Sequence, residues 1–476
     1  MGRGGKADKY MEWRLTLKEV ARAVGGILWY ADGDEIVKDV ITDSRKIVEG
    51  AVFIALKGDN FDGHKFVKSA AEQGAVCSIV DHWDIGDGTY PVIVVEDTYK
   101  ALRDTAKLYR KQFDIPIIAI TGSVGKTSTK DMIYSVLSHK FTAFKTTGNF
   151  NNEVGLPLTV FKMSSEHQIG VIEMGMSNFG EISHLTDIVK PDIAVITNIG
   201  ISHIENLKTQ ENILKAKLEI LEGMIEGSAL ILNGDDPLLW GLRGKLPFEL
   251  LYYGIKNKEC ELVAENINSF SDSTVFDFVL GGEKFTADIK VPGAHHVYNA
   301  LAAILTGVQY GMSGREIVEG IALFVPGGMR QNIIETEKYT IIKDCYNASP
   351  ASMKSGLNVL SVVDIKPGGR RVAVLGNMLE LGDFAVSSHK NVGKWVENEN
   401  VDILITVGDM AKNIALGAAE AGFSKDKIYS YETNAEAIEG LCEILKTGDV
   451  IFIKGSRGMR LEEIADALQL SGGTEE

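Results

Sequence analysis

The feature that most constrains this chain is an apolar run, Ile118–Thr121, that leads directly into the glycine-rich turn Gly122-Ser-Val-Gly-Lys-Thr127. Glycines let backbone N–H groups approach an anion closely, and the helix that follows presents its positive end at the same point. Lys126 supplies a positive charge and Thr127 a hydroxyl that can bind magnesium. The pattern indicates a phosphate cradle, and ATP or GTP is the first ligand to consider.

The turn departs from the full Walker pattern, because Ile120 stands where the first glycine belongs and Gly122 follows two residues later. A tight strand-to-helix turn with no ligand is the simpler interpretation. The flanking sequence favours nucleotide binding, since Pro116–Ile120 is rich in strand-forming residues and Thr127–His139 carries apolar residues at helical spacing.

Composition limits the partners that this chain can have. Its 476 residues allow about three domains. The 65 acidic against 49 basic residues give a net charge of −16, which argues against binding to nucleic acid or to an anionic membrane surface. The cysteines stand far apart, without a C-x-x-C pair that would indicate zinc or a disulfide framework: Cys77, Cys260, Cys345 and Cys442.

The same composition favours a cytoplasmic protein. The segment Met1–Tyr10 is polar and lacks the apolar core of a signal peptide. No apolar run approaches the roughly 20 residues that a membrane span requires. We therefore expect no membrane insertion.

Strand-like apolar runs alternate with helical stretches along the whole chain, which is the pattern of helix-covered parallel sheets. The expected strands are Ala51–Ala55, Pro91–Val95, Ile115–Thr121, Ile169–Met174, Asp192–Asn198, Ala229–Asn233, Arg371–Gly376, Asp402–Gly408 and Val450–Gly455. Helices are expected over His64–Gln73 and Tyr99–Phe113, and a β-hairpin within Asn266–Val291. The last three strands run into glycine, and such strand ends are where doubly wound sheets place ligands.

Three charged residues near strand ends or helices invite a functional interpretation. Glu173 ends an apolar strand, so its carboxylate should emerge at the sheet edge that carries the phosphate turn and could bind magnesium; a solvated carboxylate is an equal alternative. His203 and Lys217 are unremarkable when taken alone. A histidine near a strand end is more often structural, and a helical lysine usually faces solvent.

Ordered motifs change that interpretation. Four motifs occur in an order that resembles the Mur ligase family: Thr121–Thr127, Gly148-Asn-Phe-Asn-Asn-Glu-Val-Gly-Leu-Pro157, Glu173-Met-Gly175 and Ala216-Lys-Leu-Glu-Ile220. Three further strings resemble the member that adds a dipeptide: Asp344-Cys-Tyr-Asn-Ala348, Leu375-Gly-Asn-Met-Leu-Glu-Leu-Gly382 and Lys454-Gly-Ser-Arg-Gly-Met-Arg460. The match spans residues from about 40 to 465.

The resemblance implies an α/β chain of three domains. A small N-terminal α/β domain, residues 1–112, would bind the UDP-sugar peptide. A central P-loop parallel-sheet ATPase domain, residues 113–325, would bind ATP. A Rossmann-like C-terminal domain, residues 326–476, would bind the acceptor.

The implied reaction is the ATP-dependent joining of D-alanyl-D-alanine to UDP-N-acetylmuramoyl-tripeptide in peptidoglycan precursor synthesis. The substrate carboxylate would first take the γ-phosphoryl group, because a carboxylate is a poor electrophile until it becomes an acyl phosphate. Such transfer depends on positioning and on neutralising charge with lysine and Mg²⁺. ATP and Mg²⁺, with two ions expected, are the implied cofactors, and the enzyme is expected to be a monomer.

The resemblance also implies the catalytic residues. Lys126 would hold the β- and γ-phosphates, Thr127 the first Mg²⁺, and Glu173 with His203 a second Mg²⁺. Lys217 would be carbamylated by CO₂, which replaces an ammonium that repels magnesium with a carboxylate-like acceptor. The remaining nucleotide contacts would come from Gly122, Ser123, Gly125, Ser128, Asn299 (to adenine), Arg330 and Asp344.

Substrate-binding residues follow from the same resemblance. The uridine nucleotide would be bound by Ser44, Arg45 and Lys57, which supply local positive charge in an acidic chain. The strings after the cradle and in the last domain would provide Asn149, Asn151, Asn152, Tyr346, Asn347, Lys454, Ser456 and Arg457. Among these residues, the cationic side chains of Lys454 and Arg457 could bind a dipeptide carboxylate. The chain departs from the family at Ser349, commonly asparagine, and at Asn377, commonly aspartate.

Three alternatives remain at this point. One is the sibling ligase that adds the third amino acid, and another is a folylpolyglutamate synthetase-like ligase that shares the core. The third is a non-catalytic, nucleotide-dependent binding protein that kept only the cradle. The sequence does not say whether the accepted tripeptide ends in lysine or in diaminopimelate.

Overall fold

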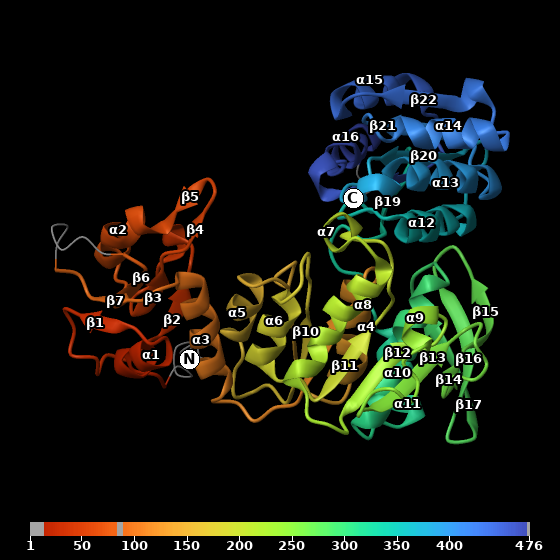
Figure 1. The fold of residues 1–476 in the computed structure, drawn as a ribbon. Helices are drawn as coiled ribbons and strands as arrows, with labels where there is room; N and C mark the ends of the chain where they lie inside the picture. Colours follow the sequence, from red (N-terminus) through yellow and green to blue (C-terminus); the bar gives the residue numbers. More distant parts are fainter. Residues whose placement is uncertain (1–13, 83–88, 474–476) are drawn as a thin grey trace, which may run out of the picture.

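The computed structural model describes residues 14–82 and 89–473, in which three helix-flanked sheets follow one another along the chain (Figure 1). They have five, seven and six strands, and a three-stranded sheet and a two-stranded hairpin accompany them. This arrangement confirms the predicted α/β class with largely parallel sheets. The domain boundaries at 112 and 325 stay a prediction.

The first sheet has the strand order β1-β7-β6-β3-β2, in which only the edge pair β1–β7 is antiparallel. Its strands are β1 (Ile27–Trp29), β7 (Val92–Val94), β6 (Cys77–Val80), β3 (Ala51–Ile54) and β2 (Asp39–Ile41). Its helices are α1 (Leu17–Ala23), α2 (Val67–Glu72) and α3 (Thr98–Arg110), with 3₁₀ turns at Ser44–Lys46 and Gly63–Phe66. The hairpin strands β4 (Lys57–Gly58) and β5 (Phe61–Asp62) precede the second turn.

Helix α3 joins the first sheet to the central one, as Figure 1 shows. Its buried residues Leu102 and Ala106 belong to one apolar cluster that continues into the central sheet. The Tyr109 hydroxyl donates a hydrogen bond to the Met163 carbonyl at 2.9 Å. The end of the first domain is therefore packed against the next one rather than free as a linker.

The central sheet is parallel throughout, with the order β14-β13-β12-β11-β8-β10-β9. Its strands are β8 (Ile117–Thr121), β9 (Ala143–Lys145), β10 (Ile169–Glu173), β11 (Ile193–Ile196), β12 (Ala229–Asn233), β13 (Glu249–Gly254) and β14 (Leu262–Val263). Strand β8 is fully buried between β10 and β11. The chain leaves β8 at the carboxyl edge, where the order of connection reverses and α/β sheets bind ligands.

Helices cover both faces of this sheet because its strands are apolar on both sides. One face is packed by α5 (Gly155–Val160), α6 (Glu181–Val189) and α8 (Gln210–Leu218). The other is packed by α4 (Lys126–Ser138), α10 (His295–Gln309) and α11 (Gly314–Ala322), and the antiparallel sheet β15 (Glu265–Ser269), β16 (Thr274–Leu280) and β17 (Glu283–Ile289) joins that core. The short helices α7 (Ile204–Leu207) and α9 (Pro237–Trp240) lie in loops at strand ends.

The last sheet has the order β18-β19-β23-β20-β21-β22, parallel except for the edge pair β18–β19. Its strands are β18 (Asn332–Glu335), β19 (Thr340–Lys343), β20 (Arg371–Gly376), β21 (Ile403–Val407), β22 (Ile428–Tyr431) and β23 (Val450–Lys454). Helices α12 (Pro350–Val362), α13 (Ala385–Asn398) and α14 (Lys412–Ala421) pack on one face, and α15 (Asn434–Ile444) and α16 (Glu462–Gly472) on the other.

Every strand expected from the sequence is present: β12 and β20 have the expected bounds, and the others are shorter by one to three residues. The expected hairpin is β16–β17. The expected helix over 64–73 begins instead with a 3₁₀ turn, and α-helix starts only at Val67. Within the described ranges, no helix combines the length and apolarity needed to cross a bilayer. The polar segment Met1–Tyr10 lies outside the described residues.

Helices α13 and α14 approach so closely that glycine is required on both. A Cβ added to Gly393 would lie 2.1 Å from the Ile414 carbonyl oxygen, and one added to Gly417 would lie 2.1 Å from that of Lys390. Such distances cannot be tolerated without moving a backbone. The two helices therefore pack backbone against backbone.

We predict that Gly393→Ala lowers the free energy of unfolding by about 1–3 kcal/mol, because the helices must separate to admit the methyl group. Gly58→Ala is the matched control, since no atom lies within 4 Å of its added Cβ. Thermal or denaturant unfolding of the two variants measures the difference. Equal stability of both variants would contradict the close packing.

Candidate active site

The turn after β8 is shaped so that backbone, and not side chains, surrounds its centre. Gly122 has φ of 151° and Gly125 has φ of 85°, a conformation that favours glycine. A Cβ added to Gly122 would lie 1.9 Å from the Thr197 hydroxyl oxygen. Helix α4 begins at Lys126, immediately after the turn, so its positive end faces the same point.

The end of β11 holds this turn in place. The Asn198 side chain accepts a hydrogen bond from the Val124 N–H at 2.9 Å and donates one to the Val124 carbonyl at 2.9 Å. Thr197 donates to the same carbonyl at 2.6 Å. The Ser123 hydroxyl accepts from the Gly200 N–H at 2.8 Å. Thr197 and Asn198 were not among the predicted site residues, although both follow directly after an apolar strand.

The Lys126 side chain folds back onto the turn that precedes it. Its Nζ donates to the Gly122 carbonyl at 2.8 Å. Burial lowers the pKa of Lys126, and the nearby Glu173 carboxylate opposes that shift. A cation that is partly desolvated and bonded only to a carbonyl is well placed to exchange that bond for an anionic phosphate.

Glu173, at the end of β10, is buried, and both of its carboxylate oxygens and its backbone N–H form hydrogen bonds. One carboxylate oxygen accepts from the Thr127 hydroxyl at 2.7 Å and the other from the Asn151 amide at 2.7 Å. The Glu173 N–H donates to the Thr146 hydroxyl at 3.0 Å. A hydroxyl and a carboxylate beside a phosphate cradle are the hard oxygen ligands that Mg²⁺ takes. The residues therefore fit a magnesium ion.

Lys217 lies on α8 with its side chain buried at 2% exposure. Burial, followed by the charge of Lys126, holds the pKa of Lys217 well below its usual range. Among the described residues, no hydrogen bond or ion pair joins its amine to a partner. An isolated buried ammonium is very costly, so burial favours the uncharged form of the Lys217 amine.

His203 contacts the last domain instead of Glu173. Its Nδ1 lies 2.6 Å from a carboxylate oxygen of Glu380, and this neighbour lowers the pKa of Glu380. His203 has φ of 62° at the start of α7. No hydrogen bond or ion pair between His203 and Glu173 occurs in the described part of the chain. Its role as a magnesium ligand stays a prediction.

Asn299 lies beneath the cradle, where its side chain is already hydrogen-bonded. Its carbonyl oxygen accepts from the Thr129 hydroxyl at 2.9 Å and lies 3.6 Å from a Cβ built on Gly125. Its neighbour His296 donates a hydrogen bond from Nε2 to the Gln331 side-chain oxygen at 3.1 Å. Burial lowers the pKa of His295 to about 4, so the start of α10 carries neutral imidazole. Contact of Asn299 with adenine stays a prediction.

The last domain brings cationic and aromatic groups to the same edge. The Arg330 guanidinium lies over the Tyr346 ring at 3.9 Å, and its charge lowers the pKa of Lys126. Lys454 forms a buried ion pair with Asp344 at 2.6 Å and donates to the Asn347 carbonyl at 2.9 Å. Arg330, which lies over Tyr346, is thus near the cradle, whereas Asp344 and Lys454 act on His296 and His295 at the start of α10. The binding roles of these four residues stay a prediction.

Other predicted residues make local contacts, and their binding roles stay a prediction. The Ser456 hydroxyl accepts from the Leu379 N–H at 2.9 Å, and Arg457 pairs with Glu462 at 2.6 Å. Asn152 accepts from the Gly155 N–H at 2.8 Å at the start of α5, whereas Asn149 is exposed. Ser128 is half-buried in the first turn of α4.

The predicted uridine-binding residues lie in the 3₁₀ turn after β2 and on the hairpin strand β4, away from this cluster. The exposed Arg45 pairs with Asp43 at 2.8 Å and lowers the pKa of that carboxyl to about 2. Ser44 starts the 3₁₀ turn, and Lys57 is exposed on β4. Their role stays a prediction.

Comparison with known proteins decides the family. Residues 37–110 match the Mur ligase family catalytic domain, residues 120–307 the Mur ligase middle domain, and residues 329–457 the Mur ligase glutamate ligase domain. The chain belongs to the Mur ligase family.

Relatives of this Mur ligase include the UDP-N-acetylmuramoyl-tripeptide–D-alanyl-D-alanine ligases of Bacillus subtilis and Escherichia coli. The first is 39% identical over 96% of this chain and 98% of its own length, and the second 31% identical over 96% and 99%. Among solved structures, MurF from Acinetobacter baumannii has a TM-score of 0.88 at 29% identity, covering 96% of this chain and 99% of its own. MurF from Thermotoga maritima in complex with ADP has a TM-score of 0.79 at 28% identity, covering 91% and 97%.

These comparisons confirm that the chain is a MurF-type Mur ligase, an ATP-dependent ligase that uses Mg²⁺, and that its fold is the three-domain fold of that group. The non-catalytic alternative is therefore set aside.

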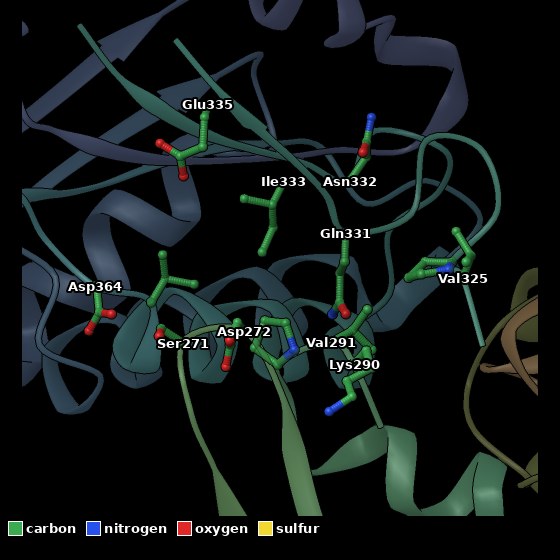
Figure 2. Close-up of a pocket in the computed structure, with 13 residues that line it drawn as sticks. Ser271, Asp272, Lys290, Val291, Val325, Gln331, Asn332, Ile333, Glu335 and Asp364 are labelled. Carbon is green, nitrogen blue, oxygen red and sulfur yellow. The ribbon is translucent and has the colours of Figure 1, made fainter. Parts of the chain in front are cut away.

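The Mur ligase has a cavity of about 470 Å³ outside the cradle, between the three-stranded sheet and the last domain. Figure 2 shows the polar side chains of Asp272, Lys290, Gln331 and Asp364 around it. None of the predicted site residues lines it, but Gln331 also bonds to His296 beneath the cradle. The cavity therefore marks the junction between the two domains and not the reacting centre.

We predict that Asn151→Ala raises the Mg²⁺ concentration needed for half-maximal activity by about 10-fold or more, because Glu173 loses the amide that orients its carboxylate. Asn358→Ala is the matched control, since it removes an amide bonded to Glu399 at the same 2.7 Å distance on another domain. Initial rates measured against Mg²⁺ concentration separate the two. An unchanged Mg²⁺ requirement in Asn151→Ala would mean that Asn151 does not orient the ligand.

Proposed function

We propose that this Mur ligase joins D-alanyl-D-alanine to UDP-N-acetylmuramoyl-tripeptide with cleavage of ATP to ADP and phosphate. The names and full-length coverage of its relatives support this reaction. The observation that carries the chemistry is the contact of Thr127 with Glu173 at the mouth of the cradle, one residue after Lys126. This contact places two candidate magnesium ligands, Thr127 and Glu173, next to the cation that would bind phosphate, Lys126.

The reaction consists of two displacements. In the first, a carboxylate oxygen of the tripeptide attacks the γ-phosphorus, the bond to the β–γ bridging oxygen breaks, and ADP leaves with that electron pair. In the second, the dipeptide amine attacks the acyl carbon, phosphate leaves with the electrons of the C–O bond, and the nitrogen loses a proton. Lys126 and the backbone N–H groups of the turn would neutralise charge on the transferred group.

Each domain would bring one substrate. The first domain, residues 1–112, would bind the uridine nucleotide through Ser44, Arg45 and Lys57. The central domain, residues 113–325, would bind ATP, and the last domain, residues 326–476, would hold the dipeptide near Tyr346, Asn347 and Lys454. The buried ion pair of Lys454 with Asp344 and the bond from Lys454 to the Asn347 carbonyl support that assignment, because they hold the polar groups of this loop together.

We further propose that Lys217 is carbamylated. Its neutral amine can attack CO₂, forming an N–C bond with release of a proton, and only the uncharged form has the lone pair that this step needs. The product is a carboxylate-like anion that would be attracted to Lys126, whereas an ammonium is repelled by it. With Glu173 and His203, it would complete the ligands for two Mg²⁺ ions.

The use of ATP and the presence of four free cysteines, Cys77, Cys260, Cys345 and Cys442, favour the cytoplasm as the place of this reaction. A monomer suffices for it, because the chain alone supplies every residue proposed to act.

The sibling ligase that adds the third amino acid is less well supported. A solved diaminopimelate-adding ligase shares only 17% identity with a TM-score of 0.53, which shows the fold alone. The dipeptide-adding relatives reach 39% identity. A folylpolyglutamate synthetase-like activity has no such support.

Substrate dependence tests the proposed function. We expect ADP and phosphate to form only when ATP, UDP-N-acetylmuramoyl-tripeptide and D-alanyl-D-alanine are all present, and the product mass to equal the two substrates less water. Lysine- and diaminopimelate-containing tripeptides, assayed side by side, identify the natural precursor. Lys126→Ala should lower the rate by about 100-fold or more. Rapid ATP hydrolysis without either peptide, or ligation of a free diamino acid instead of the dipeptide, would refute the assignment.

Lys217→Ala tests the carbamate. Its ligation rate should fall by about 100-fold or more, since a metal ligand is lost. Lys215→Ala, on the exposed face of the same helix, should retain the wild-type rate. The wild-type protein in ¹³CO₂-equilibrated buffer should give a carbamate carbon signal in ¹³C NMR that is missing from Lys217→Ala and weakens as the pH falls, because protonation removes the lone pair. A fully active Lys217→Ala enzyme would remove the carbamate from the mechanism.

A further inference from the structure

Two histidines and an aspartate meet in the first domain, far along the chain from the cradle. His64 lies in the 3₁₀ turn that follows β5, and Asp81 and His82 follow the end of β6. One ligand atom from each residue lies within 4.8 Å of the other two. Across residues 14–82 and 89–473, this is the one group of three such side chains close enough to share a metal ion.

The hydrogen bonds of His64 define which nitrogen is available. Its Nδ1 lies 2.8 Å from the Asp62 carboxylate and donates to it. Its Nε2 accepts from the Asp81 N–H at 3.2 Å and therefore carries a lone pair. That nitrogen also lies 3.1 Å from an oxygen of the Asp81 carboxylate. Two acceptors that face each other at this distance repel unless a cation lies between them.

His82 completes the group from the other side. Its Nδ1 contacts the same oxygen of Asp81, and its ring stacks on that of His64 with centroids 4.1 Å apart. The Asp81 oxygen thus lies between two imidazole nitrogens. The His64 side chain is only 9% exposed, so its nitrogen has little access to water as a substitute partner.

The distance between His64 Nε2 and the Asp81 carboxylate suits a transition metal. Zinc binds nitrogen and carboxylate oxygen at about 2.0–2.2 Å, so two ligands of a tetrahedral ion lie about 3.3 Å apart. The 3.1 Å between His64 Nε2 and Asp81 is close to this value. The bond from His64 Nδ1 to Asp62 is the carboxylate–histidine arrangement that usually orients a metal-binding imidazole.

We propose that His64, Asp81 and His82 bind a divalent transition metal ion, of which zinc is the type. His64 Nε2, the Asp81 carboxylate and His82 Nδ1 are the protein ligands, and water occupies the fourth position. Binding exchanges the 3.2 Å hydrogen bond from the Asp81 N–H for a metal–nitrogen bond. Asp62 orients His64 without touching the ion.

The proposed site joins two parts of the first domain. Asp62 and His64 follow the β4–β5 hairpin, whereas Asp81 and His82 follow β6 in the sheet. The bound ion would hold the β4–β5 hairpin against the carboxyl end of β6. This inference does not depend on the ligase chemistry, because none of these residues belongs to the proposed catalytic machinery.

Zinc titration of the full chain tests the proposal. The protein is stripped with chelator, dialysed into buffer with millimolar Mg²⁺ to fill magnesium sites, and titrated with Zn²⁺ against a chromogenic chelator. We expect one tightly bound Zn²⁺ per chain, and with Co²⁺ the visible absorption of a tetrahedral site. Zn²⁺ should also raise the unfolding temperature, because the ion binds only the folded arrangement.

Variants distinguish this site from adventitious binding. His82→Ala should weaken Zn²⁺ binding by at least about 10-fold, and Asp62→Asn by about 10–100-fold through the loss of orientation. His139→Ala is the matched control, because it removes a histidine paired with a single carboxylate, that of Glu319 at 3.0 Å. It should bind Zn²⁺ like the wild type. The unfolding temperature without zinc verifies that each variant is folded.

Two results would overturn the proposal. One is Zn²⁺ binding of equal affinity and stoichiometry in the wild type and His82→Ala. The other is no micromolar Zn²⁺ binding by the wild type, with ¹⁵N NMR showing both nitrogens of His64 protonated. In that case a proton, and not a metal ion, separates His64 from Asp81.

Discussion

The conformation of residues 122–125 is the constraint on which the rest of the active site depends. Three elements fix it: β8 leads into it, Thr197 and Asn198 at the end of β11 bond to Val124, and Asn299 lies below Gly125. The Thr197 oxygen leaves no room for a side chain at Gly122. The N–H groups of Ser123 and Val124 donate to Asn198 and so hold the turn. Because the backbone is held in this way, the remaining N–H groups of the turn need little rearrangement when an anion binds, and preorganised groups of this kind contribute most to stabilising charge.

Positively charged side chains gather near the cradle, although the chain as a whole is acidic. The net charge is −16, yet Lys126, Lys217 and Arg330 act on one another near the cradle. Burial and mutual repulsion both disfavour the charged amine, and at Lys217, which has no carboxylate partner in the described structure, both effects act unopposed. Glu173 is the nearby anion, and its contacts with Thr127 and Asn151 keep it facing Lys126.

Much of this arrangement could be predicted from the sequence, and the reason is local. Strands β8, β20 and β23 are apolar runs that end at glycine, so their pattern needs no tertiary information. Pairings over longer distances could not be read in that way. The bond from Asn151 to Glu173 spans 22 residues, and the substrate contact predicted for Asn151 stays a prediction. The contact of His203 with Glu380 depends on how the last domain packs, and the metal-binding role predicted for His203 also stays a prediction. Strands β13, β14 and β18 were missed because they are short or half-exposed, and hydrophobic periodicity is weak there.

The contacts between the central and last domains link nucleotide binding to domain position. His203 meets Glu380, His296 meets Gln331, and Arg330, which lies over Tyr346, acts on the charge of Lys126. All three interactions join the surroundings of the cradle to the segment that begins the last domain or to the loop after β20. An anion in the cradle would attract Arg330 as well as Lys126. A ligand that changes the charge at Lys126 therefore acts on a residue of the last domain, and any difference in its affinity for two domain positions shifts the balance between them.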